Sequence, residues 1–284
     1  MPMLCYILWN PDIFAFRIGA WGVRWYSLCW LVGLVVAYFL VKWLYKDQRQ
    51  KDEAIDPLFF YCFAGVLVGA RLGHCLFYQP DYFLSSGKHF IEMLLPVKFA
   101  ATGWDWTFVG YEGLASHGGA IGLMVALWLY CRRTGVSLWL VLDDIGLVAP
   151  LTGCCIRLGN LMNSEIIGKV TDVPWAFIFE LVDQAPRHPG QLYEAMAYAC
   201  FFLIGWAIYR HRRVKAGTGF YFGLCLTLVF TFRFFIEFTK DIQVAFEQYL
   251  PLDMGQILSL PFVVLGIWCI CRKGGQTSQT TRKK

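Results

Sequence analysis

The sequence predicts an all-α, polytopic integral membrane protein with seven transmembrane helices. Of the 284 residues, 57% are hydrophobic and only 16% are charged, whereas soluble domains carry charge on about a quarter of their residues. Several long apolar segments recur along the chain, each near the ~20 residues that a helix needs to cross a hydrocarbon core. We expect the seven helices at residues 22–41, 57–78, 113–131, 137–156, 191–209, 217–238 and 254–271. Together they would form one membrane domain over residues 1–273.

The distribution of Lys and Arg orients these helices, because basic loops are retained in the cytoplasm. Four basic clusters follow the first, third, fifth and seventh segments, at residues 42–51, 132–133, 210–215 and 272–284. All four fall on one side of the predicted membrane. We therefore place the N-terminus outside and the C-terminus in the cytoplasm. The main outward, periplasmic loops are then 79–112 and 157–190, and the polar tail 274–284 is expected to be a disordered, basic cytoplasmic segment.

The cysteines indicate neither a metal centre nor a disulfide framework. Eleven cysteines are scattered singly or as the pair Cys154-Cys155, without any CxxC spacing, which structural zinc sites typically use. Most lie in apolar runs, where free cysteine behaves as a small buried hydrophobe. Asp143 and Asp144 are adjacent, and adjacent helical positions do not face each other, so they make a poor metal pair. We expect no metal site.

Costly polar side chains gather at the outer ends of the predicted helices. Ionisable residues within membrane segments are rare and are commonly functional. Here six helices each contribute at least one such group at the same level, which predicts a site near the outer surface of the membrane. The contributing residues are Tyr26, Arg71, His74, His117, Arg157, Asn160, Glu194, Arg233 and Glu237.

Taken singly, several of these residues have a structural alternative. Arg71 could extend to lipid headgroups, and Arg233 with Glu237 could form an i,i+4 pair on one helix. His117, next to two glycines, could cap its helix, and Glu165 could simply neutralise Arg157. The residues alone leave these alternatives open.

The chemistry that suits this set of residues is recognition of a lipid phosphate. A guanidinium group can bind two phosphate oxygens at once, and a histidine with a pKa near ~6.5 can accept a proton at neutral pH. The chain has no glycine-rich nucleotide loop of the Walker type. It also lacks the DDxxD-type cluster with which prenyl transferases hold magnesium diphosphate. The pattern therefore favours group transfer from a phospholipid without a metal or another cofactor.

Five motifs, in order, resemble those of the prolipoprotein diacylglyceryl transferases of bacterial inner membranes. The resemblance covers nearly the whole chain. Two positions depart from the family pattern, since Ile156 and Ser164 stand where glycine is usual. The motifs are Gly69-Ala70-Arg71-Leu72-Gly73, Ser116-His117-Gly118-Gly119, Arg157-Leu158-Gly159-Asn160 continuing through Asn163 and Glu165 to Gly168, His188-Pro189 with Gln191-Leu192-Tyr193-Glu194, and Arg233-Phe234 with Glu237.

The resemblance implies a step of lipoprotein biosynthesis, the lipidation of a protein at the periplasmic face of the inner membrane. A diacylglyceryl group would pass from phosphatidylglycerol to the lipobox cysteine of a preprolipoprotein signal peptide, giving a thioether and glycerol phosphate. The nucleophilic thiol would belong to the substrate, so none of the chain's own cysteines need react. The expected partners are therefore these two substrates and membrane lipids, with no nucleic acid.

We assign site roles from this chemistry, because a thiol with a pKa near ~8.5 needs a base or a positive field to react as the thiolate. His117 is the expected base, and Arg157 and Arg233 are expected to clamp the phosphate. The remaining expected headgroup-binding residues are Tyr26, Asn160, Glu165, Gly168 and Glu237, with Glu165 and Glu237 orienting the arginines.

Two other functional classes fit a seven-helix protein with outer polar residues. A lipid transporter or flippase would use the arginines as a headgroup gate, but it needs polar residues that continue to the inner face. Only Asp143, Asp144 and Glu180 are arguable there. A receptor would bind a ligand at the outer cluster and a partner at the inner loops, although topology alone explains why those loops are short and basic.

Overall fold

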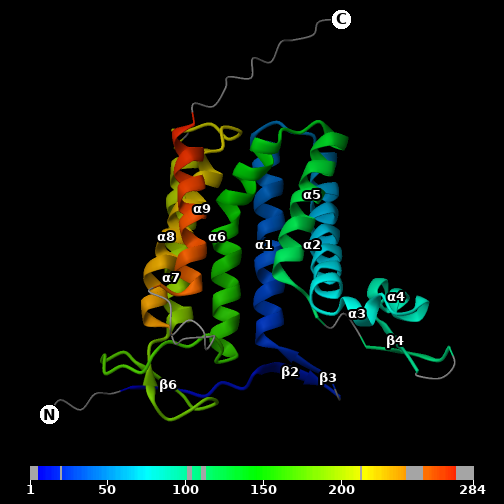
Figure 1. The fold of residues 1–284 in the computed structure, drawn as a ribbon. Coiled ribbons are helices and arrows are strands. Elements are labelled where there is room, and N and C mark those ends of the chain that lie inside the picture. The colour runs from blue at the N-terminus through cyan, green and yellow to red at the C-terminus, as the bar shows by residue number, and fades with distance from the viewer. Residues whose placement is uncertain are drawn as a thin grey trace, which may run out of the picture. The chain divides into compact units, whose positions relative to one another are not determined.

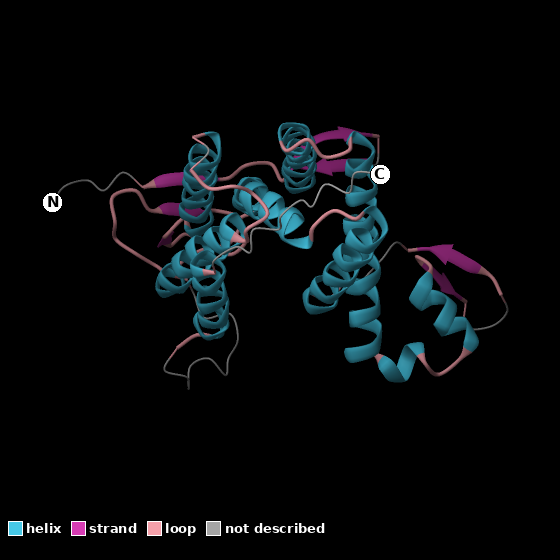
Figure 2. Cartoon of the chain, turned by 90° about the horizontal axis from the view of Figure 1, so that it is seen from above, coloured by secondary structure: helices cyan, strands magenta, loops and turns pink. Residues whose placement is uncertain are grey.

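The computed structural model describes residues 6–19, 21–100, 104–109, 113–211, 213–240 and 252–272. The described chain is mostly helical, and its strands form only small sheets of two or three short strands (Figure 2). It divides into two compact units, of which the first comprises residues 1–44 and 139–284 and the second residues 45–138. The tail predicted at 274–284 lies outside the described residues.

The first unit is built on five long helices. They are α1 (Trp25–Asp47, whose last turn belongs to the second unit), α6 (Leu138–Met162), α7 (Gly190–Arg210), α8 (Phe220–Ile236) and α9 (Met254–Cys271). α8 continues into a short 3-10 helix, η2 (Glu237–Thr239). α8 and α9 run side by side (Figure 1). Their approach is close because a Cβ on Gly223 would lie 2.6 Å from the carbonyl oxygen of Gly266.

Short strands lie at one end of these helices. β1 (Ile7–Trp9) pairs in parallel with β6 (Phe177–Phe179), and β6 pairs in antiparallel fashion with β7 (Pro186–Arg187). A separate hairpin joins β2 (Phe14–Ile18) to β3 (Trp21–Arg24). The Trp9 indole Nε1 donates to the carbonyl oxygen of Leu161 at 3.0 Å, which ties the N-terminal strand to the end of α6.

The opposite end of α6 is held by a buried carboxylate. Asp143 is fully buried, and its two oxygens accept hydrogen bonds from the backbone N–H groups of Gly217, Gly219 and Phe222 at 2.8, 2.9 and 3.0 Å. It thereby caps the start of α8, where the first N–H groups lack helical partners. This contact is structural, because it joins the start of α6 to the start of α8.

The second unit is centred on the pair formed by α2 (Ile55–Phe77) and α5 (Ser116–Thr134), which lie side by side (Figure 1). Glycines allow this approach, since a Cβ on Gly73 would lie 2.7 Å from the Cα of Gly118. Between them the chain forms a small surface layer, where the sequence predicted an outward loop. The remaining elements of the unit are η1 (Asp52–Ala54), α3 (Pro80–Phe83), α4 (Gly87–Leu94), β4 (Val97–Phe99) and β5 (Trp106–Phe108).

Six helices of the described chain are long and apolar enough to cross a membrane: α1, α2, α6, α7, α8 with η2, and α9. The predicted multi-pass, all-α architecture is thus confirmed in its coarse form. α5 occupies the predicted third span and is helical over 19 residues, but it is not among the six. Its first turn contains His117 and two glycines and its last turn contains Arg132 and Arg133, which lower its mean hydropathy. The count of seven and the orientation stay predictions.

Candidate functional site

The stretch after Arg157 folds back on the end of α6 through a chain of polar contacts. Arg157 Nη1 donates to Asn160 Oδ1 at 3.3 Å, and Asn160 Nδ2 donates to Glu165 Oε2 at 3.2 Å. The second carboxylate oxygen of Glu165 accepts a hydrogen bond from Asn163 Nδ2 at 3.1 Å. Glu165 therefore reaches Arg157 through Asn160 and makes no direct ion pair with it among the contacts of the described residues.

An unusual backbone makes this turn possible. Ser164 and Ile166, on either side of Glu165, both have positive φ angles of 53° and 58°, a region that costs non-glycine residues about 1–2 kcal/mol each. The Gln191 side chain Nε2 donates to the carbonyl oxygen of Glu165 and holds the turn from α7. Ser164 stands where the family pattern usually has glycine, and its positive φ gives the physical reason for that preference.

Glu194 is the direct ion partner of Arg157. Arg157 Nε lies 2.9 Å from Glu194 Oε2, and Lys240 Nζ lies 3.0 Å from Glu194 Oε1. Lys240 also lies 3.3 Å from Glu237 Oε2. Four charges of alternating sign thus link the ends of α6, α7 and α8, and we call Arg157, Glu194, Lys240 and Glu237 the charge network. The sequence placed Glu194 at the right level without a role, and it gave Lys240 no place in the site.

Arg233 differs from the cations of the charge network, because its side chain has no hydrogen-bond or ion-pair partner among the described residues. It is partly buried on α8. Glu237, one turn further on, pairs with Lys240 instead. The buried Tyr198 of α7 interacts electrostatically with Glu194, Arg157 and Arg233. Tyr198 therefore lies in the electrostatic surroundings of both Arg157 and Arg233. The sequence gave no reason to select it, because it resembles an ordinary aromatic residue of the core.

Gly168 lies where three segments of backbone meet. A Cβ at this position would lie 2.6 Å from the Cβ of His188 and 2.7 Å from the carbonyl oxygen of Thr239. Gly168 N donates to the carbonyl oxygen of His188 at 2.9 Å, and Gly168 forms a β-bridge with Lys240. Any side chain would separate the loop after α6 from the segments that carry Glu194 and Lys240. The structure thus gives this glycine a role in holding the charge network together.

Tyr26 of α1 packs beside the same end of α6. A Cβ on Gly159 would lie 3.0 Å from Tyr26 Cδ2, so this glycine lets the tyrosine approach within one residue of Asn160. The Tyr26 hydroxyl accepts a hydrogen bond from Trp30 Nε1 at 3.1 Å. Its own proton remains available for another acceptor.

The other predicted residues belong to the second unit. His117 is exposed in the first turn of α5. Arg71 is buried, donates to the carbonyl oxygens of Glu92 and Met93 at 2.7 and 3.3 Å, and lies 5.0 Å from the centre of the Phe83 ring. Arg71 therefore fastens α4 to α2. With His74 it lines a cavity of about 720 Å³ beside this surface layer.

The first unit presents an arrangement suited to a phosphate ester. Arg157 is fixed in place by Glu194 and Asn160, whereas Arg233 retains its full donor capacity among the described contacts. Paired guanidinium groups of this kind can bind phosphate oxygens in a bidentate manner. In surroundings with little water, they would stabilise negative charge that develops on a leaving phosphate more strongly than in bulk solvent.

Comparisons with known proteins agree with the motifs. A family model described as prolipoprotein diacylglyceryl transferase matches residues 13–272. A relative from Bacteroides fragilis is 55% identical over 266 residues, which cover 94% of this chain and 95% of the relative. Relatives from Tolumonas auensis and Chloroherpeton thalassium are 43% and 40% identical, over 92% and 95% of this chain and 95% of each relative. All three are named phosphatidylglycerol–prolipoprotein diacylglyceryl transferase.

The similarity extends across every predicted site residue, because Tyr26, His117, Arg157 and Glu237 all lie within the matched range. It also identifies the chain as an enzyme that transfers a group, which the motifs had indicated. On these grounds the chain belongs to the prolipoprotein diacylglyceryl transferase family.

Proposed function

We propose that the protein transfers the diacylglyceryl group of phosphatidylglycerol to the lipobox cysteine of a preprolipoprotein. The names of the relatives supply the two substrates. The observation that carries the proposal is the contrast between Arg157, held by Glu194 at 2.9 Å, and Arg233, which has no tied partner among the described residues. Arg157, which is held in a fixed position, and Arg233, whose donors can turn to a ligand, together suit the binding and release of an anionic headgroup.

The reaction forms one C–S bond and breaks one C–O bond. The cysteine thiolate attacks the glyceryl carbon that bears the phosphate, and the electron pair of that C–O bond leaves with glycerol phosphate. The products are a thioether and glycerol phosphate, and the thiol proton passes to a base. Arg157 and Arg233 stabilise the phosphate as it gains charge.

His117 is the proposed base, since histidine is the commonest general base in enzymes and its side chain is exposed at the start of α5. Tyr26 donates its free hydroxyl proton to a headgroup oxygen. Asn160 and Glu165 hold the Arg157 end of the site in shape.

The two remaining assignments concern the framework of the site. Gly168 permits close contact between its own loop and the segments that carry His188 and Lys240. Glu237 acts on the site through Lys240 and not, as expected from spacing, through Arg233.

The strand pairing supports seven crossings. Because β1 and β6 are hydrogen-bonded, they lie on one side of the membrane, so an even number of crossings separates them. α1, α2 and α6 supply three, and α5 supplies the fourth. The bridge between Gly168 and Lys240 likewise requires the two crossings of α7 and α8. We infer that α9 is the seventh crossing and that the termini lie on opposite sides, and the basic clusters support a site at the periplasmic face of the inner membrane.

The test uses purified protein, phosphatidylglycerol and a peptide with a single lipobox cysteine. We expect release of glycerol phosphate and a matching gain in peptide mass. Arg233→Lys keeps the charge but loses the bidentate fork, and we expect at least a tenfold drop in kcat/KM. Arg213→Lys, at an exposed loop position, is the matched control and should keep wild-type activity. A Cys→Ser peptide that is modified as fast as the cysteine peptide would refute thiol-directed transfer.

A further inference from the structure

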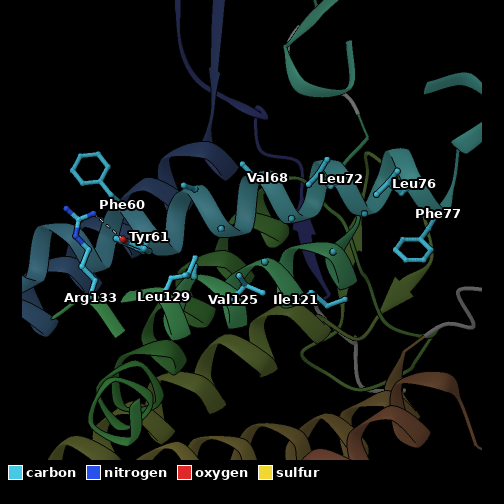
Figure 3. A pocket seen from close by; sticks show the side chains of 17 residues that line it. Phe60, Tyr61, Val68, Leu72, Leu76, Phe77, Ile121, Val125, Leu129 and Arg133 are labelled. Atoms are coloured by element: carbon cyan, nitrogen blue, oxygen red, sulfur yellow. Dashed lines mark hydrogen bonds between the residues drawn. The ribbon is translucent and has the colours of Figure 1, made fainter. Parts of the chain in front are cut away.

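A groove runs along one side of the α2–α5 pair, within the second unit (Figure 3). Its volume is about 740 Å³. Glycines such as Gly69 and Gly122 form its floor, since they carry no side chain to fill it. Its walls are apolar side chains that stand along the two helices: Val68, Leu72 and Leu76 from α2, and Ile121, Val125 and Leu129 from α5.

The position and the lining of the groove indicate its occupant. It extends along α2 from Phe60 to Phe77, and α2 is long and apolar enough to cross a membrane. Among the described residues, its lining is apolar side chains and glycines, with Tyr61 and Arg133 at one end. An apolar surface at membrane depth with a cation at one end suits an acyl chain that is joined to an anionic headgroup.

One end of the groove carries a positive charge. Arg133 is the one charged residue among those that line the groove in the described part of the chain. Its Nη1 donates to the Tyr61 hydroxyl at 3.3 Å, which holds the guanidinium at the groove mouth (Figure 3). The other guanidinium donors remain available for phosphate oxygens. Basic residues at the ends of membrane helices attract anionic lipid headgroups in this way.

We propose that this groove is a binding site for an anionic phospholipid. The phosphate lies on Arg133, and one acyl chain extends along the groove toward Phe77. None of the lining residues belongs to the charge network or has a role in the proposed reaction, although Gly118 directly follows His117. Lipid labelling and transferase activity are therefore measured separately. Since an acyl chain reaches across its own leaflet, about half of the ~30 Å hydrocarbon core, it covers the part of the groove nearest Arg133.

The test uses photoactivatable lipids with a diazirine in one acyl chain. Phosphatidic acid is the anionic probe, because it lacks the glycerol headgroup of the proposed donor, and phosphatidylcholine is the neutral probe. Each is diluted into phosphatidylcholine vesicles that contain the full-length protein, and labelled peptides are mapped by mass spectrometry. We expect adducts on the walls of the groove, with about fivefold more labelling by the anionic probe, since one basic residue contributes ~1 kcal/mol near a membrane surface.

Two variants and a matched control separate the headgroup from the chain. Arg133→Gln should bring the labelling ratio of the two probes close to one. Arg132→Gln removes the neighbouring charge, which lies 5.1 Å from the Trp128 ring and does not line the groove, and should keep the fivefold ratio. Val125→Phe fills the groove and should suppress labelling by both probes, in protein whose melting temperature is unchanged.

Three results would overturn the proposal. They are equal labelling of the wild-type groove by the two probes, an equal loss of preference in Arg132→Gln and Arg133→Gln, and displacement of both probes by a signal-peptide helix. The last result would reassign the groove to a protein substrate. Wild-type protein that is labelled in the groove as expected but shows no transferase activity would contradict the proposed function and leave the lipid site standing.

Discussion

Replacing Glu194 with Gln tests whether the charge network holds the site together. The Glu194 side chain is 0% exposed, and its two cationic partners, Arg157 and Lys240, are 16% and 3% exposed. Removing one member of a buried ion pair costs about 3–5 kcal/mol, because the remaining charge is left uncompensated. Here two cations lose their shared anion, but Arg157 retains some access to solvent. We therefore expect a loss of about 4 kcal/mol in the free energy of unfolding.

That loss can be measured as a change in melting temperature. An unfolding entropy of about 2.1 cal/mol/K per residue, over 284 residues, gives about 0.6 kcal/mol per degree. Glu194→Gln should then lower the melting temperature by roughly 7 °C, followed by tryptophan fluorescence in detergent. It should also reduce kcat more than it raises KM, since Arg157 loses its fixed position. Glu180→Gln, which removes a partly buried carboxylate that accepts from Asn10, should change the melting temperature by less than ~1 °C.

A double variant distinguishes charge balance from packing. Glu194→Gln with Lys240→Met restores a network of zero net charge, so its melting temperature should lie above that of Glu194→Gln alone. If the two substitutions instead caused independent packing defects, their losses of unfolding free energy would add. The double variant would then be less stable than both the wild type and Glu194→Gln. That outcome, or a single variant as stable as the wild type, would refute the reasoning.

Three further predictions concern the positive φ of Ser164, the cap that Asp143 forms on α8 and the protonation of His188. Ser164→Gly should raise stability by about 1 kcal/mol, because relief of its positive φ exceeds the ~0.5–1 kcal/mol of extra chain entropy; a lower melting temperature would contradict this. Asp143→Ala should cost about 3 kcal/mol in unfolding free energy, since three backbone donors lose their acceptor; chemical denaturation measures it. Burial lowers the pKa of His188 below its usual 6.5, so its contribution to stability is complete above pH 6.5 and falls as the pH drops below that value. His188→Gln should flatten melting temperature between pH 7.5 and 5.5.

The sequence alone located the helices well, because their signal is a simple run of apolar residues. The predicted last span, 254–271, coincides with α9, and the predicted second span, 57–78, differs from α2 by a few residues. α5 is the exception, since its glycines and terminal polar residues weaken that signal. Its place in the fold depends on contact with α2, which composition does not encode.

The partners within the site were harder to predict, because they depend on how helices rotate about their axes. Spacing suggested that Glu237 would pair with Arg233, yet the carboxylate pairs with Lys240, three residues on. Arg157 and Glu194 lie on different helices and meet only after α6 and α7 have packed. Lys240 lies just after the predicted sixth span, 217–238, where composition gave it no role, yet it is nearly fully buried. Local sequence patterns singled out Arg157, Glu194 and Glu237, but they did not predict which charged side chains pair with one another.

The parallel pairing of β1 with β6 has a consequence for biogenesis. The hydrogen bond between Asn10 and Glu180, at the edge of this pairing, joins positions 170 residues apart. At synthesis rates of about 5–20 residues per second, the first strand waits roughly 10–30 s for its partner. During that time its backbone donors and acceptors lack the partners that β6 supplies. Completion of this small sheet is thus a late event, because α1, α2, α5 and α6 are all synthesised between its first two strands.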